Sequence, residues 1–429
     1  MTEAASGGAS ETDATCPFCG LLCDDLRVAR TGSAIHVLAA GCELARRSFP
    51  SGPPPGGARI GGREATVGEA VRAAADILGA ARSPLFGGLA TDAAGMRAVM
   101  GLAERCGALL DHMNAQAKFR NLLVLQEGGW ITTTLAEVRN RADLLVLAGT
   151  DAVSRFPRFF ERFVWVGETL FGLAPSERQV VYLGDGLDIR AGIAPDGRPP
   201  LHLACETARL GEGFGALRAL LAGRRLDAER AAGLPMSAWR DLADRLAAAR
   251  YAVIVWSAAD LDFPHADLTV RQIAETIKDL NRQGRAAGLP LGGSDGDFTA
   301  DGVQLWQTGY PFRTRLGPDG PDYDPRRYAT AEVLARGEAD ALLWVASFDP
   351  RRGPPAAGVP TVVLGHPEMR PQREPEVFLP VGTPGVDHRA HLFRTDKVVM
   401  LPLPRLRDAG LDSVADIVAA IEKGMTTPC

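Results

Sequence analysis

Three cysteines lie within eight positions near the start of the chain, in the segment CPFCGLLCDD. They are Cys16, Cys19 and Cys23, and a fourth, Cys42, follows nineteen residues later. A C-x2-C pair puts two thiolates on one tight turn, near enough to bind the same ion or cluster. Zinc sites usually consist of two such pairs, whereas three close cysteines plus a distant one suit a [4Fe–4S] cluster. The spacing favours an iron–sulfur site, with zinc and an empty or degraded site as the alternatives.

Few other residues have the type and spacing of a catalytic or metal site. The sequence contains no HExxH motif, no P-loop and no GxGxxG dinucleotide-binding turn. His36 lies between Cys23 and Cys42 in the apolar segment AIHVLA, so we expect a core or surface position for it rather than metal ligation. Cys106 and Cys205 are expected to be buried structural thiols.

The body of the chain alternates between helical periodicity and short apolar runs. The run LLVLA, residues 144–148, is typical of a strand buried on both faces, and Thr66 with Glu69 begins a helix as a capping box. Strands separated by helices predict parallel sheets made of βαβ units, and therefore an α/β fold. The expected strands are PLFGGLA, LLVLA, QVVYLGDG, YAVIVWSA, ADALLWVASFDP and PTVVLG, and the expected helices lie near 67–81, 93–105, 214–222, 239–249, 268–283 and 329–337.

Several of these strands end in turns of similar chemistry, namely LAGTDAVSR, YLGDG and VASFDPRR. In open α/β sheets ligands bind at the carboxyl ends of the strands, so these loops are candidates for a binding site. Glycine and aspartate also make good turns for conformational reasons alone, which is the simpler explanation for any single loop. Two further segments stay open: Asp387–His391 as a cofactor or partner contact or a solvated loop, and WQTGYP as a pocket, an interface or a packed turn.

Composition and charge exclude several classes of function. The 429 residues are 46% hydrophobic and 23% charged, with a net charge of −5, as in an ordinary globular protein. No basic stripe with interleaved aromatic residues occurs, so nucleic acid is not expected as a partner. Residues 1–15 have no signal-peptide character and are expected to be a disordered tail, and no apolar run approaches the roughly 20 residues that cross a bilayer. A cytoplasmic protein with reduced thiols and no membrane contact is expected.

Length and chain-breaking residues predict several domains. Residues 16–58 form a short module that contains the cysteine cluster and needs a metal or a neighbour for stability, because it is too small to bury a core. The Pro- and Gly-rich segment Pro50–Gly62 closes it. We expect a discontinuous first α/β domain over residues 59–137 and 316–429, and a second α/β domain over 138–315.

Four segments, in order, resemble one known family, the B subunit of formylmethanofuran dehydrogenase in the molybdopterin oxidoreductase superfamily. CPFCGLLCDDL resembles its opening cluster motif, and Leu125–Arg158 resembles its T-L-x-E-x-(K/R)-x-R-A-D stretch with the strand and loop that follow. Gly302–Phe312 (GVQLWQTGYPF) and the tail Val377–Leu401 resemble two further signatures. The likeness covers nearly the whole chain after residue 15 and implies a multi-domain molybdopterin-oxidoreductase-like fold.

The resemblance also implies two cofactors. One is a [4Fe–4S] cluster bound by the four N-terminal cysteines, and the other is a molybdenum or tungsten bis-pterin cofactor gripped by loops at strand ends. In catalytic members of the family, a Cys or selenocysteine followed by His ligates that metal, some ten residues before an L-Q-E motif. Here the counterparts are Ala117 and Lys118, and no cysteine lies between Cys106 and Cys205.

Alanine has no lone pair that could bind a metal. The Mo/W-bis-pterin cofactor is therefore expected to be absent, unless Asp111 or His112 substitutes as a ligand. This departure makes oxidoreductase activity of the chain itself doubtful, and no residue is assigned a catalytic role.

Within that family the chain is most like the B subunit of the bacterial formyltransferase/hydrolase complex. The resemblance implies a complex that transfers formyl from tetrahydromethanopterin to a methanofuran analogue and hydrolyses the product to formate, in the one-carbon metabolism of methylotrophy and formaldehyde oxidation. The implied partners are the metal-dependent hydrolase, formyltransferase and C subunits, and the chain itself would be a structural, non-redox subunit. The alternatives are the redox-active, Mo/W-pterin B subunit of a formylmethanofuran dehydrogenase and a free-standing iron–sulfur electron carrier, for which the body is too large.

Overall fold

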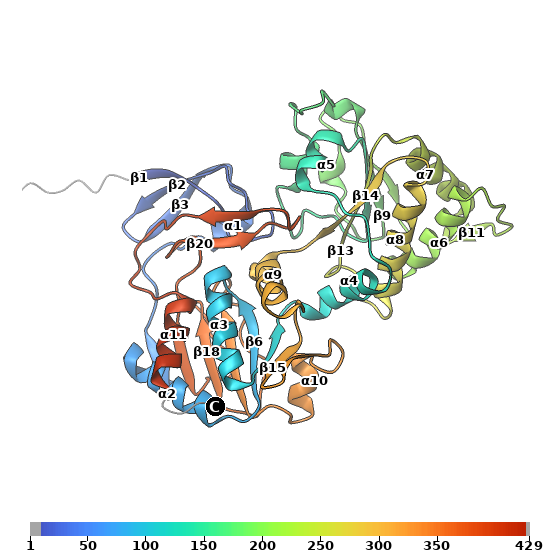
Figure 1. The fold of residues 1–429 in the computed structure, drawn as a ribbon. Coiled ribbons are helices and arrows are strands. Elements are labelled where there is room, and N and C mark those ends of the chain that lie inside the picture. The colour runs from blue at the N-terminus through green and yellow to red at the C-terminus, as the bar shows by residue number, and fades with distance from the viewer. Residues whose placement is uncertain (1–9, 426–429) are drawn as a thin grey trace, which may run out of the picture. The chain divides into compact units, whose positions relative to one another are not determined.

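The computed structural model describes residues 10–425, which fall into two compact units (Figure 1). The first comprises Met1–Ala115 and Gly293–Cys429, and the second comprises Gln116–Gly292. The sequence instead placed these boundaries at 137/138 and 315/316. The difference arises because helix α4 (Ala115–Gly128) buries Val124 in the core of the second unit, whereas helix α9 (Asp297–Thr308) buries Val303 in the core of the first. The four-part division with a separate cysteine module stays a prediction.

The cysteine segment is part of a small antiparallel sheet. Strands β1 (Ser10–Ala14), β2 (Leu26–Thr31) and β3 (Ala34–Ala39) pair in that order, and helix α1 (Glu43–Ser48) follows. The expected disordered tail is therefore wrong for residues 10–14, because β1 pairs along its whole length with β2 and buries Ala14. Residues 1–9 of that tail lie outside the described residues. Pairing with a neighbour, rather than its own apolar pattern, makes this polar segment a strand.

The first unit is built on a nine-stranded sheet of order β16-β15-β7-β6-β17-β18-β19-β4-β5. The five inner strands from β7 to β19 run parallel, as predicted, and the strands at both edges are antiparallel. The bounds are β4 Ala58–Ile60, β5 Arg63–Ala65, β6 Pro84–Ala90, β7 Leu109–His112, β15 Thr314–Gly317, β16 Gly320–Tyr323, β17 Ala341–Ala346, β18 Thr361–Gly365 and β19 Val377–Pro380. A separate hairpin pairs β20 (Ala390–Phe393) with β21 (Met400–Leu403).

Helices bury both faces of this sheet. On one face α2 (Val67–Ala80), α3 (Ala93–Cys106), α9 (Asp297–Thr308) and α11 (Val414–Gly424) share a core with alternate strand residues such as Phe86 and Leu343; α2, α3 and α11 lie in front of the sheet in Figure 1. The intervening Leu342 packs on the other face with Val333 of α10 (Thr330–Ala335). The predicted capping box is confirmed: Thr66 Oγ1 accepts from Glu69 N at 3.2 Å and Thr66 N donates to Glu69 Oε2 at 2.9 Å.

The second unit has a fully parallel five-stranded sheet of order β10-β9-β8-β13-β14. Its strands are β8 Leu144–Ala148, β9 Gln179–Leu183, β10 Leu201–Leu203, β13 Ala252–Ser257 and β14 Ala286–Leu291. Its helices are α4 Ala115–Gly128, α5 Leu135–Arg141, α6 Leu210–Leu221, α7 Met236–Ala248 and α8 Ala266–Leu280. A separate pair, β11 (Arg230–Ala231) and β12 (Leu234–Pro235), packs against helices α6 and α7.

Strand β8 is buried on both faces, as predicted. Val146 contributes to the core with α6, α7 and α8, while its neighbours Leu145 and Leu147 are also fully buried. From β8 the chain adds β9 and β10 on one side, and then β13 and β14 on the other. The order of the strands therefore reverses between β8 and β13, which is where ligands bind in open α/β sheets. In the described part of the chain, no helix is long and apolar enough to span a membrane.

Candidate functional site

The three N-terminal cysteines lie on one closed loop between β1 and β2. Cys16 N donates to Cys23 O at 2.9 Å, and Leu22 N donates to Cys19 O at 3.2 Å. Leu22 has a positive φ of 45°, which lets the chain turn back sharply. All three cysteines are buried. The loop therefore folds the C-x2-C-x3-C segment around its own thiol groups.

The fourth cysteine reaches this region from another element. Cys42 is the N-cap of α1, where its Sγ accepts a hydrogen bond from Ala45 N at 3.4 Å. It is partly buried, whereas His36, on β3, is exposed. The expectation that His36 is not a ligand agrees with its outward position.

The thiol groups influence one another electrostatically, so they are neighbours. The pKa of Cys19 is raised to about 12, mainly by burial and in smaller part by the nearby Cys23 and Cys42. Burial also raises the pKa of Cys16, with additional contributions from the other three cysteines. A bound cation would relieve both effects, because a coordinated thiol is deprotonated outright. Three of the predicted ligands are thus buried on one loop, and the partly buried Cys42 lies near enough to affect the pKa of Cys16 and of Cys19.

The spacing of these donors does not suit a single metal ion. Among the described residues, no three His, Cys, Asp or Glu side chains stand close enough to hold one ion. An all-thiolate set is nevertheless the ligand chemistry of iron–sulfur clusters, which are several atoms across and separate their ligands more widely.

A second candidate site is a cavity of about 580 Å³ at the carboxyl edge of the five-stranded sheet. The predicted loops after β8 and β9 both line it, as do residues that follow β10 and β13. Thr150 Oγ1 donates to Asp260 Oδ2 at 2.6 Å, and Arg155 Nε donates to Asp260 Oδ1 at 2.5 Å. These hydrogen bonds join the loop that follows β8 to the loop that follows β13, where the order of the strands reverses. The third predicted loop, VASFDPRR, belongs to the first unit.

The lining of this cavity is acidic. It carries one guanidinium group, that of Arg155, which pairs with Asp260. It also carries five carboxylates: Asp151, Asp185, Glu206, Asp260 and Asp262. The hydroxyl and backbone N–H of Thr207 donate to Asp185 and lower its pKa, so it is ionised. Such a lining repels phosphate and pyrophosphate groups. The cavity does not fit an anionic pterin phosphate.

The position expected to ligate a redox metal lies in the first turn of α4. Ala117 is half-buried there and Lys118 follows it. The two residues considered as substitutes are engaged elsewhere. Asp111 pairs with Arg313 at 3.3 Å, with both side chains less than 5% exposed, and also accepts from Thr330 N at 2.7 Å. His112 Nδ1 accepts from Asn114 N at 2.9 Å.

A polar network that sequence reasoning missed lies beside His112 in the first unit. Asn114 Nδ2 donates to Asp297 Oδ2 at 3.1 Å and to Asp295 Oδ2 at 3.3 Å, while Asn114 Oδ1 accepts from Arg352 at 2.5 Å. Arg352 also pairs with Asp295 at 3.4 Å. The signal that could have revealed it is the run SDGD, residues 294–297, because two acids on a tight turn need nearby donors.

That run belongs to GGSDG, residues 292–296, which matches the G-x-S-x-G pattern of a nucleophile elbow. In such an elbow the serine itself takes the strained turn position. Here the positive φ angles belong to Gly293, Asp295 and Gly296, and not to Ser294. The segment is a chain reversal before α9 in which the serine does not hold the strained elbow position.

The remaining sequence candidates are structural or open to solvent. Asp387 is not part of a solvated loop: it is buried and pairs with Arg407 at 2.6 Å. Trp306 is 62% exposed and meets Phe393 edge-on, and Tyr310 stacks on Tyr323 with ring centroids 4.5 Å apart.

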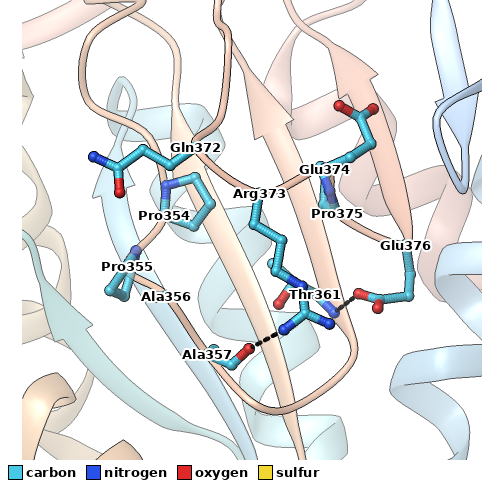
Figure 2. Close-up of a pocket in the computed structure, with 10 residues that line it drawn as sticks. All are labelled: Pro354, Pro355, Ala356, Ala357, Thr361, Gln372, Arg373, Glu374, Pro375 and Glu376. Atoms are coloured by element: carbon cyan, nitrogen blue, oxygen red, sulfur yellow. Dashed lines mark hydrogen bonds between the residues drawn. The ribbon is translucent and has the colours of Figure 1, made fainter.

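A small cavity between the start of β18 and the segment 372–376 is shown in Figure 2. Arg373 crosses it and donates to Ala357 O at 3.0 Å, and Glu376 accepts from Thr361 N at 2.6 Å. Its volume of about 30 Å³ suffices for roughly one water molecule. It is a packing gap and not a cofactor site.

No model of a known protein family matches the chain. The B subunit of the formyltransferase/hydrolase complex of Methylorubrum extorquens is 32% identical over 340 residues, which cover 76% of this chain and 85% of that subunit. The chain belongs to this B-subunit family. The family resemblance found in the sequence is confirmed.

Other members of the wider family are more distant from this chain. The B subunits of tungsten-containing formylmethanofuran dehydrogenase 2 from Methanocaldococcus jannaschii and Methanococcus maripaludis are each 24% identical, over 89% and 92% of this chain and 91% and 95% of theirs. A crystal structure of the complex FhcABCD from Methylorubrum extorquens, solved with methylofuran, matches with a TM-score of 0.73 at 28% identity, over 86% of this chain and 98% of that one. The predicted α/β fold is therefore confirmed.

Proposed function

We propose that the chain is the B subunit of a formyltransferase/hydrolase complex and acts there as a structural, non-redox subunit. In that role it supports formyl transfer and hydrolysis to formate in tetrahydromethanopterin-linked one-carbon metabolism. The observation that carries the non-redox part is Ala117, which is followed by Lys118 at the position where the resemblance expects a thiolate and a histidine. A methyl group offers no electron pair to a metal.

Two further features support the absence of a Mo/W-bis-pterin cofactor. Asp111 is held by Arg313 and Thr330, so it is not available as a replacement ligand. The cavity at the carboxyl edge of β8 and β13 is lined by five carboxylates, which repel the phosphate groups of a pterin cofactor. The alternative, a redox-active dehydrogenase subunit, would need another metal ligand in place of Asp111 and a different binding place for the pterin phosphates.

The proposed partners are the metal-dependent hydrolase, formyltransferase and C subunits, in the cytoplasm. A role as partner agrees with the solved relative, which was crystallised as part of a complex called FhcABCD. We also propose that a [4Fe–4S] cluster is held by four residues, Cys16, Cys19, Cys23 and Cys42. Because no redox metal is expected to receive electrons, the cluster would stabilise the N-terminal sheet and would not take part in electron transfer.

Purification of the complex that contains this chain, under anaerobic conditions, tests the proposal. We expect the hydrolase, formyltransferase and C subunits to co-purify, the preparation to release formate, and molybdenum, tungsten and pterin to be absent by elemental and fluorescence analysis. Stoichiometric molybdenum or tungsten together with pterin would refute the non-redox role. Failure to co-purify with any of the three subunits would refute the assignment to the complex.

A further inference from the structure

A second cavity in the Gln116–Gly292 unit lies at the opposite edge of the five-stranded sheet, beside the amino ends of β9 and β10. Its volume is about 400 Å³, within the range of small-molecule sites. It shares no lining residue with the acidic cavity. We propose that this cavity binds a small organic oxyanion, a carboxylate or a phosphate. The proposal is independent of the role in the complex.

The charge of the lining indicates the sign of the ligand. Three arginines line the cavity, Arg178, Arg198 and Arg245, and none of its lining residues is acidic. Guanidinium groups bind carboxylate and phosphate oxygens in pairs of hydrogen bonds. The two cavities of this unit thus have opposite electrostatic character, and this one attracts anions.

Arg178 supplies a fixed positive charge to the wall. It is fully buried, and its Nη atoms donate to carbonyl oxygens at the end of α5: Val138 and Ala142 at 3.0 Å each, and Arg139. Its Nε has no hydrogen-bond acceptor in the described part of the protein. Burial lowers its pKa to about 10, so it is charged at neutral pH. The nearby carboxylates of Asp143 and Glu177 oppose this lowering, but they form their direct ion pairs with Arg250 and not with Arg178.

The other two arginines are placed at the mouth of the cavity. Arg198 ends a tight turn in which Gly197 N donates to Ala194 O at 2.8 Å and Ala194 N donates to Arg198 O at 3.0 Å. Pro199 and Pro200 follow directly and restrict the backbone. Arg245 Nη1 donates to Gln179 Oε1 at 2.8 Å. Arg198 pairs with Asp196 at 3.8 Å and Arg245 with Asp241 at 2.9 Å, and both carboxylates are about half exposed. The arginine side chains are themselves 40% and 38% exposed, so an anion from solvent can reach both and compete with these surface pairs.

The rest of the lining suits an organic group. Trp165 is half-buried, and its indole N–H donates to Ala191 O at 2.8 Å, which fixes the ring. Pro199, Pro200 and Leu201 add apolar surface. A wall that joins a fixed indole ring to guanidinium groups favours an anion that carries a flat or apolar part.

Isothermal titration of the full-length chain, alone and in its complex, with phenyl phosphate, benzoate and inorganic phosphate tests the proposal. We expect binding of at least one organic probe, and an affinity about tenfold weaker in Arg198→Gln and in Arg245→Gln. Arg225→Gln is the matched control, since Arg225 is 92% exposed and lies outside the cavity; its affinity should be unchanged. Tighter binding of phenyl phosphate or of benzoate would identify the ligand as a phosphate or a carboxylate.

A second measurement does not depend on the variants folding. Phenyl phosphate or benzoate should protect Arg198 and Arg245 from phenylglyoxal in the native protein, whereas Arg225 should react at the same rate with and without the probe. The proposal fails if no probe binds, if Arg225→Gln weakens binding as much as Arg198→Gln, or if protection is equal at all three arginines.

Discussion

Arg407 pairs with the buried Asp387 and also bonds the backbone on both sides of Cys42. Its Nε donates to Asp387 Oδ1 at 2.6 Å, and its Nη1 donates to the carbonyl oxygens of Ser33 and Gly52 at 2.8 and 2.7 Å. The two side chains are 5% and 1% exposed. Ser33 and Gly52 flank the stretch that contains Cys42, so one buried arginine holds both ends of it.

Removal of this arginine should destabilise the protein strongly. We expect Arg407→Met to lower the free energy of unfolding by about 3–5 kcal/mol, because Asp387 would be left as a buried charge without its cation. Urea unfolding followed by circular dichroism measures the loss. Arg405→Met is the control: Arg405 pairs with Asp408, the two side chains are 46% and 74% exposed, and the loss should stay below about 1 kcal/mol. Equal losses in the two variants would contradict this role for Arg407.

Stability should depend on pH through His366, which follows β18. Burial lowers its pKa, an effect that Arg407 reinforces and that Glu368, Asp387 and Asp349 oppose. Its Nδ1 accepts from Glu368 N at 3.2 Å, as a neutral ring can. Because the folded-state pKa is depressed, the unfolded chain binds more protons in acid. The stability contribution is therefore present above the unfolded pKa of about 6.5 and is lost as pH falls through the folded value.

Melting temperatures between pH 7.5 and pH 5 test this expectation. The decline on acidification should be shallower in His366→Gln than in the native protein, and it should be unchanged in His391→Gln, whose histidine is exposed. An equally steep decline in His366→Gln would show that other groups cause the acid sensitivity.

The six apolar runs named in the sequence all form parallel strands, because a continuous apolar run is a local property; they are β6, β8, β9, β13, β17 and β18. The segments LLVLA and PLFGGLA form β8 and β6, and both could be predicted without knowing which strands lie next to them. Strand β14 was missed because AAGLPL contains Gly288 and Pro290, which disfavour strands. The structure explains the glycine: a Cβ there would lie 2.7 Å from the Trp256 ring. That contact between neighbouring strands cannot be seen in the local pattern.

The candidate sites show the same division between local and long-range information. The thiols were found because four cysteines are informative at any spacing, and the loops after β8 and β9 because strand ends bind ligands. Asp260, however, meets Thr150 only because β13 pairs with β8, across 110 positions of sequence. The network of Asn114 with Asp297 joins residues 183 positions apart. Such pairs depend on strand order, which a single sequence does not display.

The Asn114 network should be sensitive to loss of its donor. Asn114→Leu removes hydrogen bonds to Asp295 and Asp297 and should lower the free energy of unfolding at pH 7 by about 1–3 kcal/mol. Burial raises the pKa of Asp295, and the hydrogen bond from Asn114 lowers it. Without that bond the ionised carboxylate is costlier to bury, and the cost appears only as pH rises and Asp295 ionises.

The loss in Asn114→Leu should therefore be smaller near pH 4 than at pH 7. Asn140→Ala, which removes exposed hydrogen bonds to Ala136 O and from Leu170 N, is the control and should cost less than about 1 kcal/mol at both pH values. A loss in Asn114→Leu that is the same at both pH values would show that it reflects packing and not the carboxylates.

The proposed cluster should be a structural element. Anaerobically prepared chain should contain roughly four iron atoms, and Cys19→Ser should lower this content sharply. Cys205→Ser is the matched control, because Cys205 is also buried but belongs to the second unit; its iron content should match that of the native protein. Equal iron in all three preparations, or iron absent from the native chain, would contradict the cluster.

Stability and catalysis should then separate in the Cys19→Ser variant. Without the cluster, the N-terminal sheet keeps its hydrogen bond from Arg407. It loses the iron atoms whose positive charge would stabilise the buried thiolates, such as that of Cys16, whose pKa burial otherwise raises. The melting temperature and the yield of assembled complex should fall, whereas formate release per assembled complex should stay at the native rate, because no electron passes through the site. A specific loss of formate release in fully assembled complex would instead mean that the cluster takes part in the reaction.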